Sequence, residues 1–143
     1  MSDHGAESSL PADVRRFLAE AGRFAVVATV NPDGTPHQAV TWYLLDGDSL
    51  VLNSKVGRRW PSNLARDGSV SVLVADGYRW ASLRGMVLVV SDQARAQADI
   101  AAMARRYHAD DPAAAEREIR TFETQERVTF VLRAASVAAD LGE

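Results

Sequence analysis

Apolar residues recur with two different periods along the chain, and the changes of period divide it into helices and strands. Around Phe17 the apolar residues fall at helical spacing, whereas the run from Phe24 to Val30 is continuous and rich in β-branched residues, as in a strand. This pattern predicts helices over residues 11–21, 59–66, 91–107 and 110–122, and strands over residues 24–30, 35–45, 49–53, 69–75, 78–90 and 128–132, with 136–137 as an extension of the last.

Short turns join most of the predicted strands. Residues 31–34, 46–48 and 76–77 are rich in Asn, Asp and Gly, the residues that tight turns require. Such connections predict antiparallel hairpins and a meander of the first three strands, and they exclude a parallel Rossmann sheet, which needs a crossover after each strand. Because an apolar antiparallel sheet of about six strands must close or be covered, the predicted fold is mainly β, a small barrel with peripheral helices. Residues 10–143 are predicted to form one domain after a disordered tail, residues 1–9.

The amino-acid composition limits the classes of protein to which this chain can belong. The 143 residues are about the length of one domain, and a hydrophobic fraction of 47% is enough for a packed core. The net charge of −3 argues against a general nucleic-acid-binding protein. The absence of cysteine excludes disulfides and thiolate catalysis, and the three histidines lack the spacing of a metal site. No apolar run approaches the roughly 20 residues of a membrane span, and the N-terminus lacks a signal-peptide core, so we expect a cytoplasmic protein.

The segment from Asn53 to Asp67 contains the clearest candidate binding chemistry. It is predicted to form a strand end, a glycine turn and a short helix, with Lys55, Arg58 and Arg59 around the turn. Free backbone N–H groups at a helix start, together with arginine side chains that can donate two parallel hydrogen bonds, make a site for a phosphate. The alternative interpretation is a solvated basic turn.

Several segments in order resemble a known superfamily. They are FAVVATVNPDGTPHQ, GRRWPSNLARD, SVSV, WASLRG and ERVTFVL, at residues 24–38, 57–67, 69–72, 80–85 and 126–132. Together they resemble the split β-barrel flavin and deazaflavin oxidoreductases related to pyridoxamine 5′-phosphate oxidase. Within that superfamily they are most similar to the actinobacterial branch that uses the deazaflavin coenzyme F420. The resemblance covers roughly residues 10–140 and implies a split β-barrel (the FMN-binding type).

The same resemblance implies a homodimer that binds its cofactor in a groove between the subunits. The residues that match family positions around the cofactor tail are Ser54, Arg58, Arg59 and Asn63. Many F420-using relatives have a lysine three residues before this asparagine, whereas this chain has Trp60 there. Trp60 either packs against the cofactor or fills the end of the barrel, and the charge would come from the arginines and Lys55. The predicted cofactor-binding segment also includes Asn53, Lys55 and Gly57.

A second group of candidates lies on the strands. In the family, backbone groups along the strand at residues 38–43 contact the cofactor ring, which places Gln38 and Trp42 at the predicted site. An aromatic residue there either lines the ring or belongs to the core. The candidates for the groove or the substrate are His37, Trp80 and Arg84. The alternatives are a rim histidine for His37 and a surface ion pair for Arg84.

The resulting functional hypothesis is a reductase that transfers a hydride from reduced F420 to a small unsaturated or heteroaromatic substrate. No catalytic side chain is predicted, because in such enzymes the cofactor ring carries the hydride. Two alternatives stay open: an FMN-dependent oxidoreductase like pyridoxamine-phosphate oxidase, and a cofactor-binding or carrier protein without turnover. Neither a nucleic acid nor a membrane is predicted as a partner.

Overall fold

An antiparallel sheet is the central element of the computed structural model, which describes residues 9–20 and 22–142. The predicted tail, residues 1–9, lies outside this part of the chain except for Ser9. The helices are α2 (Ala12–Ala19), α3 (Arg59–Arg66), α4 (Gln93–Tyr107) and α5 (Pro112–Phe122), and the strands are β1 (Ala25–Val30), β2 (Pro36–Thr41), β3 (Leu44–Asp46), β4 (Ser49–Lys55), β5 (Ser69–Asp76), β6 (Arg79–Val90), β7 (Arg127–Arg133) and β8 (Ser136–Asp140). The predicted mainly-β class is confirmed.

The eight strands make one curled antiparallel sheet, a split barrel, in the order β2-β1-β5-β6-β7-β4-β3, with β8 paired to β6. The long strand β6 connects the two parts of the sheet, because residues 79–86 pair with β5 and residues 87–90 pair with β7. Gly85 lies at this change of partner. A Cβ atom there would be 3.2 Å from the backbone nitrogen of Ala135 and 3.2 Å from Cδ1 of Leu132, so a side chain at this position would have to displace its neighbours slightly.

The predicted strand over residues 35–45 is wrong, and so is the meander built on it. The chain leaves the sheet at Trp42 and Tyr43, so that β2 pairs with β1 while β3 pairs with β4 at the opposite end of the sheet. Tertiary contacts cause the break: the ring of Trp42 stacks on Tyr107, and the Tyr43 hydroxyl donates a hydrogen bond to the carbonyl oxygen of Leu18. This break and β8 raise the number of strands from about six to eight.

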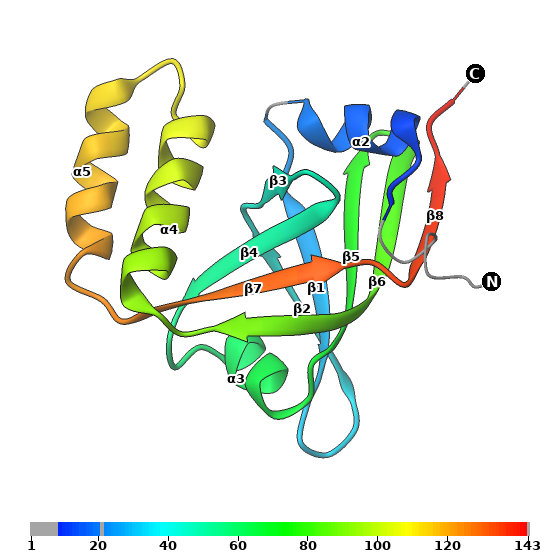
Figure 1. Ribbon diagram of the computed structural model, residues 1–143, viewed down its shortest axis with the longest axis horizontal. Coiled ribbons are helices and arrows are strands. Elements are labelled where there is room, and N and C mark those ends of the chain that lie inside the picture. The colour runs from blue at the N-terminus through cyan, green and yellow to red at the C-terminus, as the bar shows by residue number, and fades with distance from the viewer. Residues whose placement is uncertain (1–8, 21, 143) are drawn as a thin grey trace.

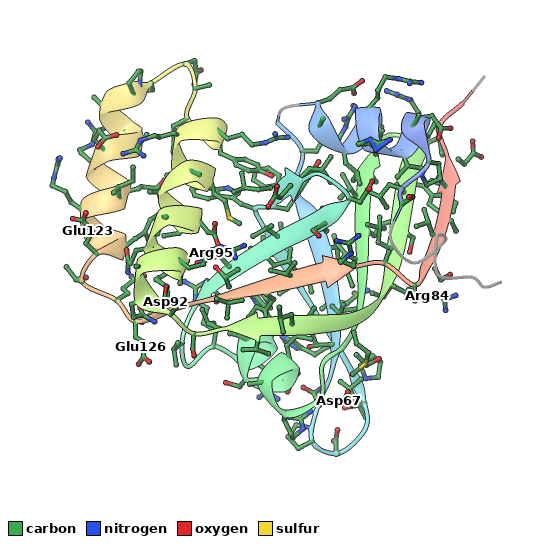
Figure 2. All side chains as sticks on the ribbon, in the orientation of Figure 1. Asp67, Arg84, Asp92, Arg95, Glu123 and Glu126 are labelled. Atoms are coloured by element: carbon green, nitrogen blue, oxygen red, sulfur yellow. The ribbon has the colours of Figure 1, made fainter. Side chains whose placement is uncertain are left out.

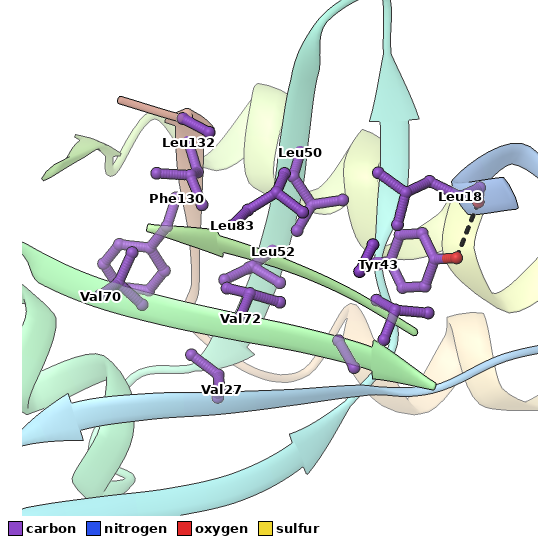
Figure 3. Packing of buried hydrophobic residues seen from close by; sticks show 14 of the residues in the cluster. Leu18, Val27, Tyr43, Leu50, Leu52, Val70, Val72, Leu83, Phe130 and Leu132 are labelled. Atoms are coloured by element: carbon purple, nitrogen blue, oxygen red, sulfur yellow. Dashed lines mark hydrogen bonds between the residues drawn. The ribbon is translucent and has the colours of Figure 1, made fainter. Parts of the chain in front are cut away.

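The core fills the inside of the curled sheet. Its fully buried side chains come from inward-facing positions of β1, β4, β5, β6 and β7 and from α2. Figure 3 shows this packing and the hydrogen bond from Tyr43 to Leu18, which joins α2 to the segment between β2 and β3. Leu64 of α3 and Tyr43, between β2 and β3, also belong to this core. Its largest fully buried side chains are Tyr43, Phe17, Phe130, Leu18, Leu50, Leu52, Leu64, Leu83 and Leu132.

The helices cover different parts of the sheet. In Figure 1, α2 and α3 lie at opposite ends of the sheet, while α4 and α5 form an antiparallel pair beside β4 and β7. A second, smaller cluster of Val51, Ile100 and Met103 joins α4 to β4. α4 therefore lies against β4, the strand that leads into the basic turn of the sequence. Within the described ranges, no helix is both long and apolar enough to cross a bilayer.

The buried hydroxyl of Tyr43 should make the stability of the protein depend on pH. Its side chain is fully buried, and desolvation, followed by the proximity of Tyr107, raises its pKa from 10.0 to about 12. The folded state therefore holds this proton more tightly than the unfolded state. This proton therefore contributes up to about 2.7 kcal/mol to the free energy of unfolding. The contribution should be fully present below pH 10 and should be lost as the pH rises toward 12. Urea unfolding of the protein between pH 9 and pH 12 measures this slope.

Tyr43→Phe is the matched variant for this measurement. It should be less stable at pH 9 by about 1 kcal/mol, because the hydrogen bond to Leu18 is lost, and its stability should fall less steeply above pH 10. Equal slopes for the two proteins would show that Tyr43 does not titrate with the fold.

Candidate functional site

A cavity of about 250 Å³ lies between β2 and β4, where the two ends of the curled sheet face one another. Residues of α3, α4, α5 and the start of β7 also line it, so its walls come from segments that are far apart in the sequence. Its lining residues are Phe24, Val40, Thr41, Trp42, Asn53, Ser54, Arg58, Trp60, Ile100, Glu118, Phe122 and Arg127. Five of the residues predicted from the sequence are brought together here: Trp42, Asn53, Ser54, Arg58 and Trp60.

The basic turn lies at the edge of this cavity. Gly57 has a φ of 108°, a conformation that favours glycine, and it reverses the chain between β4 and α3. Arg58 is exposed, lines the cavity and is the N-cap residue of α3; among the described side chains none caps that helix start. Arg59 does not line the cavity, and its Nη1 lies 3.5 Å from Oδ1 of Asn31. Lys55 is exposed and also lies outside the cavity lining. The structure thus separates Arg58 from the other two basic residues.

Two predicted cofactor residues on α3 anchor the helix. Asn63 is buried, and its amide nitrogen donates to the hydroxyl of Thr29 at 3.0 Å and to Oδ1 of Asn31 at 3.1 Å. Both donors of Asn63 are therefore engaged with β1 and the turn after it. Trp60 packs on Phe130 in the core, with ring centroids 5.6 Å apart, and also borders the cavity. Trp60 consequently fills the barrel end and forms part of the site.

Asn53 links the sheet to the helical pair. Its side chain is 3% exposed, and its amide nitrogen donates to the carbonyl oxygen of Ala96 at 2.9 Å and to the hydroxyl of Thr129 at 3.0 Å. Its Oδ1 accepts from Nε of Arg127 at 3.0 Å. The Thr129 hydroxyl donates to Asp99, which completes a chain of hydrogen bonds from β4 through β7 to α4. Asn53 therefore positions its neighbours with all its donors in use.

Arg127 is the site residue that the sequence did not reveal. Its side chain is 5% exposed, and it borders the cavity beside Arg58. Nη1 donates to Oε1 of Gln125 at 2.6 Å, and the guanidinium lies 4.7 Å from the ring centroid of Phe122. Burial and then the positive charge of Arg58 lower the pKa of Arg127 to about 10. An arginine at the start of an apolar strand has no sequence signal of a binding role, since a surface position is its usual place.

Aromatic rings form part of the cavity wall, and Tyr107, which lies outside the lining, supports two of them. Tyr107 of α4 lies between Phe24 and Trp42, with ring centroids 5.7 Å and 5.0 Å away, and both stacks are nearly parallel. Phe122 of α5 meets Trp42 edge-on at 6.3 Å. The Tyr107 hydroxyl also donates to the carbonyl oxygen of Arg23, which fixes the stack to the start of β1. The cavity thus combines flat apolar walls with two guanidinium groups.

The remaining predicted residues lie outside the cavity lining. Gln38 is exposed on β2 and His37 is half-buried beside it. Trp80 is half-buried on β6, opposite Ala75 and Asp140 of the neighbouring strands. Arg84 is exposed and donates to the hydroxyl of Ser136 at 3.3 Å, and Figure 2 shows it near β8, away from α4 and α5. The structure does not bring these four residues to the cavity that Arg58 and Arg127 share.

Comparison with known proteins agrees with the geometry of the fold. Residues 10–136 match the family described as pyridoxamine 5′-phosphate oxidase. A solved F420 reductase is 27% identical, with a TM-score of 0.67, over 86% of this chain and 94% of that protein. Two more distant structures share the fold. The conserved hypothetical protein Rv2991 from Mycobacterium tuberculosis is 22% identical over 94% of this chain and 86% of its own, with a TM-score of 0.72. HupZ of Group A Streptococcus is 13% identical over 91% of this chain and 94% of its own, with a TM-score of 0.64. No curated protein matches the chain.

The curled antiparallel sheet with a cavity at its split defines a class of flavin-type oxidoreductase folds. The match over residues 10–136 places the chain in the pyridoxamine 5′-phosphate oxidase family, which confirms the resemblance seen in the sequence.

Proposed function

We propose that the protein is an F420-dependent reductase that passes a hydride from reduced deazaflavin to a small unsaturated or heteroaromatic substrate. The observation that carries this proposal is the cavity at the barrel split, which joins aromatic walls to Arg58 and the start of α3. The similarity to an F420 reductase over 86% of the chain supports the choice of cofactor. When bound, the deazaflavin would supply the hydride, while the protein binds and orients the reactants.

The residues present fit a phosphate-bearing planar cofactor. A phosphate would be held by Arg58 and by the backbone N–H groups at the start of α3, which no described side chain caps. Ser54 lines the cavity, but its hydroxyl donates to the carbonyl oxygen of Lys55 at 3.1 Å. A planar ring would lie against apolar surface such as Trp42 and Phe24. In this proposal Asn53 and Asn63 keep the segment in place without donating to the ligand, because their donors are already used.

Two other functions would use the same cavity. FMN also combines a flat ring with a phosphate, and the match to the pyridoxamine 5′-phosphate oxidase family favours it as the alternative cofactor. A carrier without turnover would bind the reduced cofactor equally well but would not speed its reoxidation by any substrate. The cytoplasmic location and the absence of a nucleic-acid partner remain predictions from the sequence.

We also propose that the protein is a homodimer with the cofactor between its subunits. The outer face of β1, β2, β5 and β6 exposes apolar side chains, among them Val40 at 68% and Met86 at 65%. Val40 and Leu73 both face Val26 across their strand pairs, so the apolar positions are contiguous. This face borders the cavity through Val40 and Phe24, so that a second subunit seated on it would complete the wall of the site.

Light scattering on the purified protein tests the dimer. A chain of 15.5 kDa should give a mass of about twice that value. Val40→Glu, which puts a charge on the apolar face, should shift the mass to one chain, whereas the exposed Arg120→Gln on α5 should not. A single-chain mass for the unmodified protein at micromolar concentration would contradict the proposal.

Fluorescence titration with F420 and, separately, with FMN tests the cofactor. We expect tighter binding of F420, followed by faster reoxidation of reduced F420 when an accepted substrate is added. Tight FMN binding with weak F420 binding would move the protein to the flavin-dependent branch. Binding without any substrate-dependent reoxidation would indicate a carrier.

Substitution of the basic turn tests the phosphate-binding role. Replacing Arg58 and Arg59 together by alanine should weaken cofactor binding by about tenfold or more, because charge-assisted hydrogen bonds are lost, and should leave the melting temperature unchanged, since both side chains are exposed. Of the single variants, Arg58→Ala should account for most of the loss, because only Arg58 borders the cavity. Unchanged affinity in the double variant would rule out the proposed role of the turn.

A further inference from the structure

Arg127 is a buried cation without a counter-ion. Among the residues that the structure describes, no carboxylate forms an ion pair with it, and its polar partners are the neutral amides of Asn53 and Gln125. The nearest charge that acts on it is the positive charge of Arg58. One acidic residue, Glu118, borders the same cavity, and its carboxylate is engaged by His108. The cavity is therefore lined by two cations and one carboxylate, and neither cation forms an ion pair with a described carboxylate.

Hydrogen bonds hold both the backbone and the side chain of Arg127 at this position, where its unpaired charge is buried. Its backbone N–H donates to Oε1 of Gln93 at 3.0 Å, and its carbonyl oxygen accepts from Nε2 of the same side chain at 2.7 Å. The side chain is held by Asn53 on one side and by Gln125 on the other, above the ring of Phe122. A buried charge lowers stability unless it is paired, and a neutral side chain would pack here without that cost. Such an arrangement is useful when a ligand supplies the missing negative charge.

We propose that Arg127 and Arg58 form an oxyanion subsite on the wall of the cavity, which takes a phosphate or carboxylate group. Arg127 is the preorganised, buried member, and Arg58 is the exposed member that closes on the anion from the turn before α3. A guanidinium whose Nε and one Nη are tethered still presents its other nitrogen for a charge-assisted hydrogen bond. The anion belongs either to the tail of the cofactor or to the substrate. The inference rests on the proposed function only in taking this cavity as the ligand site.

Inorganic phosphate probes the subsite without any cofactor. Binding is measured by calorimetric titration of the full chain at constant ionic strength, for the unmodified protein, Arg127→Gln, Arg127→Lys and Arg58→Gln. Arg127→Gln keeps an amide donor but removes the charge, and it should weaken phosphate binding by about tenfold or more. Arg127→Lys should retain part of the affinity. Arg120→Gln, an exposed change of equal charge outside the cavity, should bind as the unmodified protein does.

Thermal unfolding separates a binding role from a structural one. If Arg127 serves the ligand, Arg127→Gln should melt within a few degrees of the unmodified protein in the absence of phosphate, and it should lose the rise in melting temperature that phosphate produces. The exposed variant Arg58→Gln should lose the same phosphate-dependent rise, which keeps the test valid if Arg127→Gln folds poorly. An unaltered phosphate affinity in both variants would overturn the subsite.

Phosphate-free ligands identify the source of the anion. If the cofactor supplies it, Arg127→Gln should reduce the preference for F420 over its phosphate-free deazaflavin chromophore, and for FMN over riboflavin. If the substrate supplies it, those ratios should stay unchanged, while benzoate should bind the cofactor-loaded variant more weakly than the loaded unmodified protein. Arg127-dependent phosphate binding without binding of F420 or FMN would leave the subsite intact and contradict the proposed function. Tight F420 binding with none of the Arg127 effects would support the proposed function and contradict the subsite.

Discussion

The buried amide of Asn53 connects the parts of this molecule that make a site possible. It donates from β4 to the helix α4 and to Thr129 of β7, and it accepts from Arg127. A buried amide must find partners for its donors and acceptor, and here those partners lie on two other elements, α4 and β7. The requirement holds the helical pair against the sheet and keeps the guanidinium of Arg127 at the cavity. Stability and binding geometry therefore depend on the same hydrogen bonds.

The split of the barrel is what creates the cavity. β2 and β3 are consecutive in sequence but lie at opposite ends of the sheet order, because the chain leaves the sheet at Trp42 and Tyr43. Trp42, which stacks on Tyr107 of α4, and Phe122 of α5 line the opening, and the turn at Gly57 brings Arg58 to its edge. A closed barrel would fill this space with side chains. The opening leaves flat apolar walls next to positive charge, a combination suited to a planar, anionic ligand.

The sequence located most of the elements and part of the site. The turn residues, the glycine at position 57 and the helical spacing around Ile100 are local signals, and the helices and strands that they predict are present. The exceptions are the strand over residues 35–45, which is divided in two, and β8, which was predicted only as an extension of the strand before it. Ser54, Arg58 and Trp60 were found because the motif that contains them is contiguous. Arg127 was missed because its role comes from neighbours 74 and 69 positions away in sequence, Asn53 and Arg58. No local pattern records such a contact.

By itself the sequence determined the mainly-β class, the antiparallel connections and the basic segment before α3, since each follows from short-range periodicity or turn chemistry. Tertiary structure decided which of the basic residues share a cavity, which asparagines are consumed as anchors, and where the second strand breaks. Those outcomes depend on side chains distant in sequence competing for the same buried hydrogen bonds and stacking surfaces. The pairing of Arg58 with a buried Arg127 is the clearest case, because only the folded chain brings the two charges together.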